Sequence, residues 1–341
     1  MPRRSGPSSS RLAVVDLARG LALIAMVVYH FSWDLSYFRY VPWNVSFGPE
    51  WKLFARAIAT SFLILAGLSL VLARTASWMA YLKRLGLITA SALAITGVTF
   101  WMMPDRFIFF GILHAIALFS VIGLAFRSAP VWLIAAAAIV SAGLPFVASA
   151  ELFDARFLEF LGLGTKPPLS NDYVPVFPWF AAYLTGIGLG RWVEARRDRI
   201  ARIRLGTGRI GGGIGTAGRH TLAIYLIHQP VLMGLLYGLT FVLPQPAATP
   251  GPETVAAYLD TCRRSCQSGG GEAGFCARHC SCTADSIIDA GLWGPAGTGT
   301  MTDAQRARFR VLIATCRAAS ADTPQNLLPF SAPPAPSRDA P

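Results

Sequence analysis

The sequence is poor in charged residues, which make up only 14% of its 341 positions. A soluble globular protein carries about 25% charged residues, so an ordinary soluble fold is excluded. A disordered or fibrous chain is also excluded, because 53% of the residues are hydrophobic and no compositional repeat runs through the sequence. Together with a mean hydropathy of +0.47, these properties indicate a polytopic membrane protein.

Seven stretches are long and apolar enough to cross a bilayer, which takes about 20 mostly apolar residues. They are residues 12–31, 53–73, 85–103, 107–126, 130–148, 176–193 and 220–243. The first stretch does not resemble a cleaved signal peptide, since no small-x-small cleavage site follows it. We therefore predict an all-α membrane bundle of about seven spans over residues 12–243, preceded by a short cytoplasmic tail over residues 1–11.

The net charge of +12 and the isoelectric point near 9.9 raise the question of a nucleic-acid partner. The positions of the basic residues answer it. Alternate loops, starting with the amino terminus, hold 15 Lys and Arg, whereas the other loops and span ends hold 6. Short loops rich in Lys and Arg stay in the cytoplasm. We therefore predict a cytoplasmic amino terminus, an exported carboxyl terminus and no nucleic-acid partner.

Cysteine is absent from the first 261 residues, and all six cysteines follow the last span. They are Cys262, Cys266, Cys276, Cys280, Cys282 and Cys316. An even set in an exported segment indicates disulfides. Two Cys-x3-Cys helices folded across residues 268–271 could be clamped by Cys262–Cys280 and Cys266–Cys276, with Cys282–Cys316 holding a third helix. This pairing is one of the 15 that six cysteines allow, and the spacing resembles the twin Cys-x3-Cys hairpins of small exported proteins.

The alternative for this region is a zinc site built from His279 and Cys276, Cys280 and Cys282, although thiolate ligands suit a reducing compartment better. We expect a small periplasmic helical domain over residues 250–320 and no metal. The Pro- and Ala-rich end, residues 321–341, is predicted to be disordered.

The first span carries four ionisable residues, which are costly inside a membrane and usually face a bundle interior or a cavity. Asp16, Arg19, His30 and Asp34 fall within about 60° of one another on a helical wheel. Asp34 lies one turn beyond His30, where it could orient the ring and raise its basicity. The structural alternative is an Asp16–Arg19 pair at a helix end and a His30 that bonds to neighbouring backbone.

Two more polar motifs are candidates for a site. His114 lies in the fourth span at a depth close to that of His30, which suggests a shared pocket unless His114 is structural. In the seventh span Thr221, Tyr225 and His228 share an arc of about 60°. Pro230 has no N–H to donate to the carbonyl of Leu226, which leaves that acceptor free beside them. This span therefore holds a ligand site or, as we favour, a network of polar side chains with a structural role.

Two loops also carry motifs. Gly211-Gly212-Gly213 lies in the Arg-rich loop before the last span and lacks the Gly-Lys-Ser/Thr ending of a P-loop. A flexible linker is the default interpretation, and a phosphate-binding helix start is the alternative. In the loop before the sixth span, Asp172 and Tyr173 begin a stretch rich in Pro and aromatic residues that either anchors at the interface or closes the outer mouth of a pocket.

These motifs, taken in order, resemble the bacterial branch of the heparan-alpha-glucosaminide N-acetyltransferase catalytic-domain family. The stretches are VDLARG at 15–20, YHFSWD at 29–34, FGILH at 110–114, DYVP and FPW within 172–179, and IYLIHQP at 224–230. The resemblance covers roughly residues 9–243. It implies a helical bundle of the bacterial inner membrane that moves an acyl group from cytoplasmic acetyl-CoA to a sugar or glycan on the far side. The cysteine-rich segment lies outside it.

The resemblance suggests roles for the candidate residues. Arg19, paired with Asp16, would hold the CoA phosphates with Arg84 and Arg219. His30, oriented by Asp34, would act as the general base, and His114 would polarise the thioester carbonyl or serve as a second base. Asp172, Tyr173, Tyr225 and His228 would line the substrate pocket. The eukaryotic member places its active-site His in the loop after the first span, where this sequence has Tyr40, and His30 is the substitute candidate.

Two other classes of function remain open. A proton-coupled transporter or flippase would use the same His and Asp residues as a relay across the membrane, but it has no reason to bind CoA. A scaffold would use the spans only to anchor the exported domain, for which a buried polar stripe is unnecessary. The oligomeric state is left open.

Overall fold

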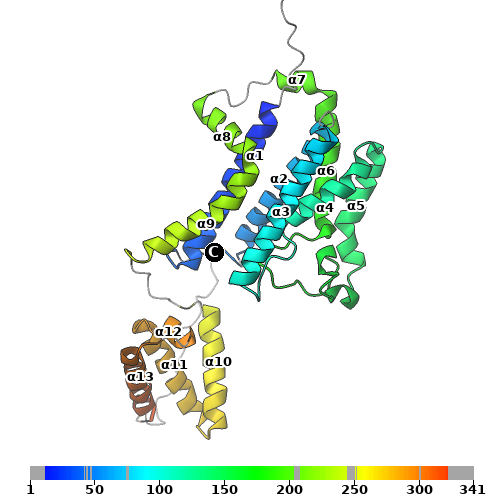
Figure 1. The fold of residues 1–341 in the computed structure, drawn as a ribbon. Helices are drawn as coiled ribbons and strands as arrows, with labels where there is room; N and C mark the ends of the chain where they lie inside the picture. Colours follow the sequence, from blue (N-terminus) through cyan, green and yellow to red (C-terminus); the bar gives the residue numbers. More distant parts are fainter. Residues whose placement is uncertain are drawn as a thin grey trace, which may run out of the picture. The chain divides into compact units, whose positions relative to one another are not determined.

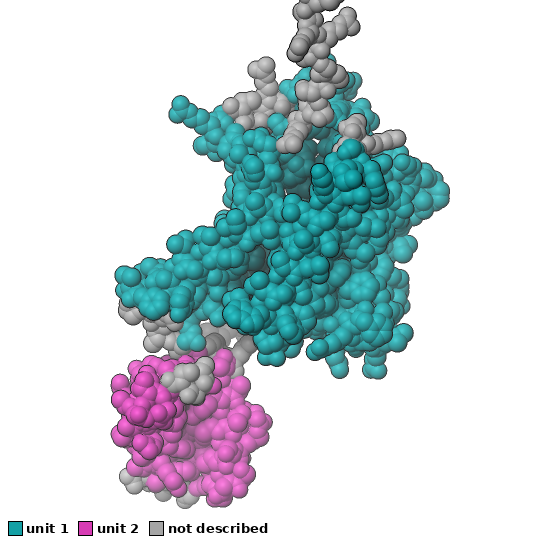
Figure 2. Space-filling view, in the orientation of Figure 1, with its two compact units in different colours: residues 1–243 teal, residues 244–341 magenta. Residues whose placement is uncertain are grey.

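The structure, a computed structural model, describes residues 12–41, 43, 45–46, 48–73, 77–202, 208–243, 250, 252–298 and 301–321. The predicted tail over residues 1–11 and the predicted disordered end beyond residue 321 lie outside these ranges. The described residues form helices and turns without a strand, so the predicted all-α fold is confirmed. The chain divides into two compact units, residues 1–243 and residues 244–341 (Figure 2).

The first unit holds a helix at each of the seven predicted spans (Figure 1). Its elements are α1 (Ala13–Tyr37), α2 (Pro49–Leu72), α3 (Trp78–Met102), α4 (Ile112–Phe126), α5 (Val131–Val147), the 3-10 turns η2 (Glu151–Asp154) and η3 (Glu159–Leu161), α6 (Val176–Ala195), α7 (Arg197–Ala201), α8 (Arg209–Arg219) and α9 (Thr221–Leu239). The first helix continues six residues beyond the predicted stretch, which keeps Asp34 inside it.

The lengths and apolar surfaces of these helices make the chain a multi-pass membrane protein. Helices α1, α2, α3 and α9 are long and apolar enough to cross a membrane, and α4 and α5 are shorter apolar helices. Helix α6 has 20 residues and is not among the four candidate spans. It packs against α2 and α5, and its residues Tyr183, Leu184 and Ile187 are fully buried. A helix enclosed by protein has less need of a lipid-facing apolar surface.

Glycines bring the central helices into close contact. A Cβ added at Gly67 on α2 would overlap the carbonyl oxygen of Tyr183 on α6, and one added at Gly186 would overlap that of Ile64. Small residues at helix interfaces let backbones approach in a membrane, where dispersion contacts rather than water exclusion hold helices together. The α2–α6 pair therefore forms the rigid centre of the bundle.

Helix α8 corrects the interpretation of the glycine-rich loop as a flexible linker. Residues 209–219 are helical and pack along α1. A Cβ at Gly218 would overlap the carbonyl oxygen of Asp16, and a Cβ at Gly20 would overlap that of Ile214. The glycines here form a helix contact, a role that composition alone does not distinguish from a linker. Gly206 of the same loop lies outside the described residues.

We predict that Gly218→Ala destabilises the protein whereas Gly213→Ala does not. The methyl group added at position 218 would overlap the α1 backbone, and overpacking of this kind costs about 1–3 kcal/mol. The exposed Gly213 has nothing within 4 Å of its Cβ position, and Ala there favours the helix. Thermal unfolding in detergent should show a melting temperature several degrees lower for Gly218→Ala. Equal melting temperatures for the two variants would contradict the α1–α8 contact.

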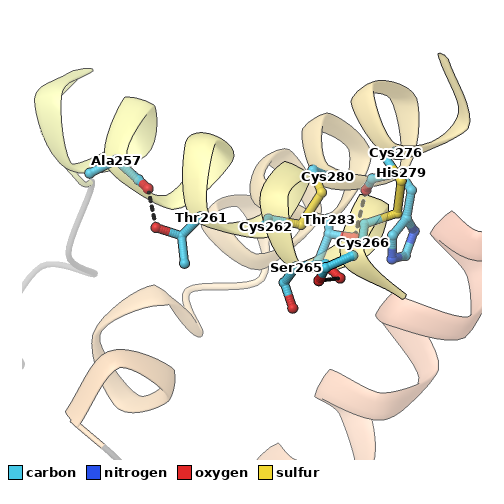
Figure 3. The surroundings of a disulfide bond; sticks show 10 residues. Ala257, Thr261, Cys262, Ser265, Cys266, Cys276, His279, Cys280 and Thr283 are labelled. Atoms are coloured by element: carbon cyan, nitrogen blue, oxygen red, sulfur yellow. Dashed lines mark hydrogen bonds between the residues drawn. A yellow bond between two sulfur atoms is a disulfide. The ribbon is translucent and has the colours of Figure 1, made fainter. Parts of the chain in front are cut away.

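The second unit contains α10 (Pro252–Ser268), α11 (Ala273–Asp289), α12 (Trp293–Thr298) and α13 (Asp303–Ala321). The predicted pairing is confirmed. Cys262–Cys280 and Cys266–Cys276 join α10 to α11 (Figure 3), and Cys282–Cys316 joins α11 to α13. The turn between α10 and α11 passes through Gly270 at φ +88°, a conformation that glycine adopts without strain.

The disulfides also decide against the zinc alternative. Cys276, Cys280 and Cys282 are each bonded to another cysteine, so no thiolate is left for a metal. His279 stacks on Phe275 with their ring centroids 5.7 Å apart.

Candidate functional site

The first unit contains a large cavity that we call the arginine cavity. It encloses about 790 Å³ and takes side chains from α1, α2, α3, α4, α7, α8 and α9. Four arginines line it: Arg19, Arg84, Arg197 and Arg219. The remaining walls are mainly apolar and include Leu65, Leu87 and Leu222. A cavity with these walls can hold a ligand that is anionic at one end and apolar along its length.

Arg19 is held by two hydrogen bonds. Its Nη1 donates to Asp16 Oδ1 over 2.8 Å, and its Nη2 donates to Ser69 Oγ on α2 over 2.7 Å. Asp16 is buried, so an ion pair is needed there to compensate for its desolvation. The sequence predicts the pair between Asp16 and Arg19, but Ser69 is a partner that only the tertiary fold supplies.

The other three arginines are held differently. Arg219 donates to Thr216 Oγ1 over 2.7 Å, and Arg197 pairs with Glu194 over 3.0 Å. No hydrogen bond or ion pair joins the Arg84 side chain to another described residue. Asp16 is the one acidic residue among the described residues that line the cavity, so the lining carries a clear excess of positive charge and attracts anions. Sequence reasoning missed Arg197, because nothing but charge distinguishes it from its neighbouring arginines.

A second polar site lies between α1 and α9, which we call the histidine cluster: His30, Asp34, His228 and Gln229. The rings of His30 and His228 meet edge to face with their centroids 4.9 Å apart. Gln229 Nε2 donates to Asp34 Oδ1 over 2.7 Å, and the Asp34 side chain is fully buried.

The expected hydrogen bond between Asp34 and His30 does not occur among the bonds of the described residues. Residues four apart on a helix can reach each other, but Asp34 is bound by Gln229 of α9 instead. A helical wheel of α1 contains no information about the helix packed on it, and so it could not reveal this partner.

The geometry of His228 fixes its tautomer. Its Nδ1 lies 2.7 Å from the carbonyl oxygen of Tyr225, and because a carbonyl only accepts, Nδ1 carries the proton in the neutral ring. Nε2 therefore keeps its lone pair, and it is buried without a hydrogen-bond partner among the described residues. The sequence suggests the carbonyl of Leu226, freed by Pro230, as the acceptor in this region, but His228 uses that of Tyr225.

The histidine cluster contains several buried polar atoms that lack hydrogen-bond partners among the described residues. Within the described part of the first unit, such atoms are Asp34 Oδ2, His228 Nε2 and Gln229 Oε1. Buried polar atoms without a partner are uncommon and call for an explanation. A substrate that approaches between α1 and α9 would provide the missing hydrogen bonds.

Both ring nitrogens of His114 have hydrogen-bond partners in the protein. The Gly111 N–H donates to its Nδ1 over 3.2 Å, so Nε2 carries the proton and donates to Thr96 Oγ1 over 3.1 Å. The Thr96 hydroxyl in turn donates to the Ile108 carbonyl over 2.7 Å. Both ring nitrogens are thus engaged in joining α3 to the start of α4. The ring contacts of His30 among the described residues are with Tyr29 and His228, and none joins it to His114.

Asp172 and Tyr173 hold the loop before α6 in place. The Ile112 N–H donates to Asp172 Oδ2 over 2.9 Å, which caps the start of α4, and the Tyr173 hydroxyl donates to the Glu159 carbonyl over 2.6 Å. Burial raises the pKa of Asp172 to about 6 and that of Tyr173 to about 12. Neither residue lines the arginine cavity.

Tyr225 connects the two polar sites. It lines the arginine cavity, its ring lies 5.8 Å from that of His228, and its carbonyl binds His228 Nδ1. Tyr40, in contrast, donates its hydroxyl to the Leu243 carbonyl over 3.3 Å, away from both sites. Tyr225 therefore contacts both the arginine cavity and the histidine cluster.

Most of the first unit matches a family of known proteins. A model of the catalytic region of heparan-alpha-glucosaminide N-acetyltransferase matches residues 11–230. The chain belongs to this family. Family members are acetyl-CoA-dependent N-acetyltransferases, and the matched region contains the whole arginine cavity and the histidine cluster. Comparison with curated proteins and with solved structures found no match.

We predict a pH-dependent difference in stability between wild type and Asp172→Asn. A folded-state pKa of about 6 lies above the ordinary carboxyl value of 3.8, so the stability that protonated Asp172 provides is lost as pH rises from about 4 through 6. The amide can still accept from Ile112 and never ionises. Melting temperatures should be similar at pH 4.5, and the variant should be the more stable by a few degrees at pH 7. A melting-temperature difference between the two proteins that does not change with pH would contradict the burial of an ionisable Asp172 at the start of α4.

Proposed function

We propose that this protein is an acetyltransferase that moves an acetyl group from acetyl-CoA on the cytoplasmic side to a sugar or glycan on the opposite side of the bacterial inner membrane. The observation that supports this most directly is that Tyr225 lines the arginine cavity and binds His228 Nδ1 through its carbonyl, while His228 Nε2 has no partner among the described residues. Membership of the acetyltransferase family supports the reaction class.

The arginine cavity suits the donor. Arg19, Arg84, Arg197 and Arg219 would bind the CoA phosphates, because guanidinium groups present planar pairs of donors that match phosphate oxygens. The leucine-rich walls would bind the pantetheine arm. Arg84 lies near the start of α3 and Arg219 ends α8, and both belong to the loops predicted to be cytoplasmic. This orientation gives the cavity access to cytoplasmic acetyl-CoA.

His228 would act as the general base. Its Nε2 accepts the proton of the acceptor amine or hydroxyl while the lone pair of that group attacks the thioester carbonyl carbon. The C–S bond then breaks and CoA leaves as a thiolate, which takes up the proton. The Tyr225 carbonyl stabilises the imidazolium through Nδ1. His30 packs against the reacting ring, and Asp34 with Gln229 would position the acceptor through their unpartnered oxygens.

Purified protein in detergent should bind acetyl-CoA saturably, hydrolyse it slowly and transfer the acetyl group to an amino-sugar acceptor such as glucosamine. His228→Ala should lower turnover about 10²- to 10⁴-fold, the usual contribution of a general base, with little effect on donor binding. His30→Ala should lower turnover less. Arg19→Gln should mainly weaken donor binding. The matched control is His220→Ala, which removes an exposed histidine beside α9 that lines neither site.

Full turnover in His228→Ala would remove that residue from the mechanism. Absence of acetyl-CoA binding to wild type at millimolar concentration would contradict the acetyltransferase itself. In that case the half-buried His30 and His228 and the buried Asp34 would favour a proton-coupled transporter or flippase, which should show proton uptake in liposomes without any donor.

A further inference from the structure

A second cavity lies beside the first and shares Arg84 with it. It encloses about 440 Å³ among α2, α3, α4 and α6. Its polar lining is Trp78, Tyr81, Arg84, Ser120, Arg127 and Tyr183. It lies where α3 begins and α4 ends, at the same end of the bundle as the arginine cavity. Nothing in the proposed acetyl transfer uses Arg127 or this space.

The hydroxyl groups that line this cavity already donate hydrogen bonds to other groups of the protein. The Tyr81 hydroxyl donates to the Ser120 carbonyl over 3.0 Å, and the Tyr183 hydroxyl donates to Ser120 Oγ over 3.3 Å. Ser120 Oγ donates in turn to the Ile116 carbonyl over 2.6 Å. These bonds fix the wall and leave the two guanidinium groups and the Trp78 indole N–H as its side-chain donors.

The two arginines create an uncompensated positive site. Arg84 and Arg127 both line this cavity, together with Tyr81. No carboxylate occurs among the described lining residues. Neither arginine side chain has a hydrogen-bond or ion-pair partner in the described ranges. Two cations held near each other without a counter-charge favour an anion between them.

The rest of the lining indicates what kind of anion fits. Leu70, Leu85, Ile88 and Leu124 form apolar walls. Trp78, the first residue of α3, stacks on Tyr81 with ring centroids 5.1 Å apart and is 62% exposed. Aromatic residues of this kind gather at the head-group level of a membrane. The chemistry is therefore a phosphate group attached to a larger, partly apolar molecule.

We propose that this second cavity binds a phosphate ester through Arg84 and Arg127. Two molecules could supply it: an anionic phospholipid, with its head group between the arginines and an acyl chain along the leucines, or the donor itself, with one CoA phosphate reaching past Arg84. Only the second source rests on the proposed function.

The test compares Arg127→Gln with Arg199→Gln, which removes an exposed arginine that lines neither cavity. One arm measures retention of phosphatidylglycerol against phosphatidylcholine on the purified full-length chain by native mass spectrometry. The other measures the dissociation constants of CoA and of CoA that lacks its 3′-phosphate. Arg127→Lys keeps the positive charge but lacks the planar guanidinium with its paired N–H donors. Melting temperatures identify any variant that misfolds.

If the bound phosphate ester is a lipid, Arg127→Gln should lose the preference for phosphatidylglycerol over phosphatidylcholine. If it is the donor, wild type should bind intact CoA about tenfold or more tightly than CoA without its 3′-phosphate, and Arg127→Gln should lose this difference. Arg199→Gln should keep both, and Arg127→Lys should lie between. The proposal is overturned if folded Arg127→Gln binds both ligands like Arg199→Gln, or if wild type prefers neither. Wild type that retains phosphatidylglycerol but binds no CoA would refute the acetyltransferase and still support this site.

Discussion

The packing of α8 and α9 along one face of α1 determines the geometry of both polar sites. Gly218 lies so close to the Asp16 carbonyl that no side chain fits between them, and this contact sets Arg219 beside the cavity that Arg19 lines. Further along the same two elements, His228 and Gln229 meet His30 and Asp34. A shift of α8 against α1 would therefore disturb the arginine cavity and the histidine cluster together.

The two sites show how a membrane helix accommodates polar groups in different ways. At one end of α1, Asp16 and Arg19 neutralise each other and are completed by Ser69, which satisfies the rule that buried charges are paired. About 16 Å further along the helix, the cluster around His228 leaves three polar atoms unpartnered. The first arrangement is stable by itself, whereas the second is suited to groups that a substrate provides. The apolar cavity wall and Tyr225 join them.

Much of the fold could be predicted from the sequence, because apolar runs and cysteine spacing are local properties. A helix at each of the seven predicted stretches and the three disulfides follow from them. The polar stripe of α1 was also visible, since period 3.6 places its residues on one face. Apart from the Asp16–Arg19 pair, the partners of the polar residues in the two sites were not predictable. Ser69, Gln229 and the carbonyl of Tyr225 come from elements that only packing brings near, so the sequence favoured His30 with Asp34 where the proposed mechanism uses His228. The glycines of α8 indicated a linker for the same reason, because their contact lies on another helix.

The most direct measurement is a structure of the full-length protein determined with CoA bound. The account predicts phosphate density against Arg19, Arg84 and Arg219 in the arginine cavity, with the thiol end directed toward Tyr225 and His228. Density for CoA at another place on the protein, or phosphates in this cavity with the thiol directed away from α9, would contradict the assignment of this path to acetyl transfer.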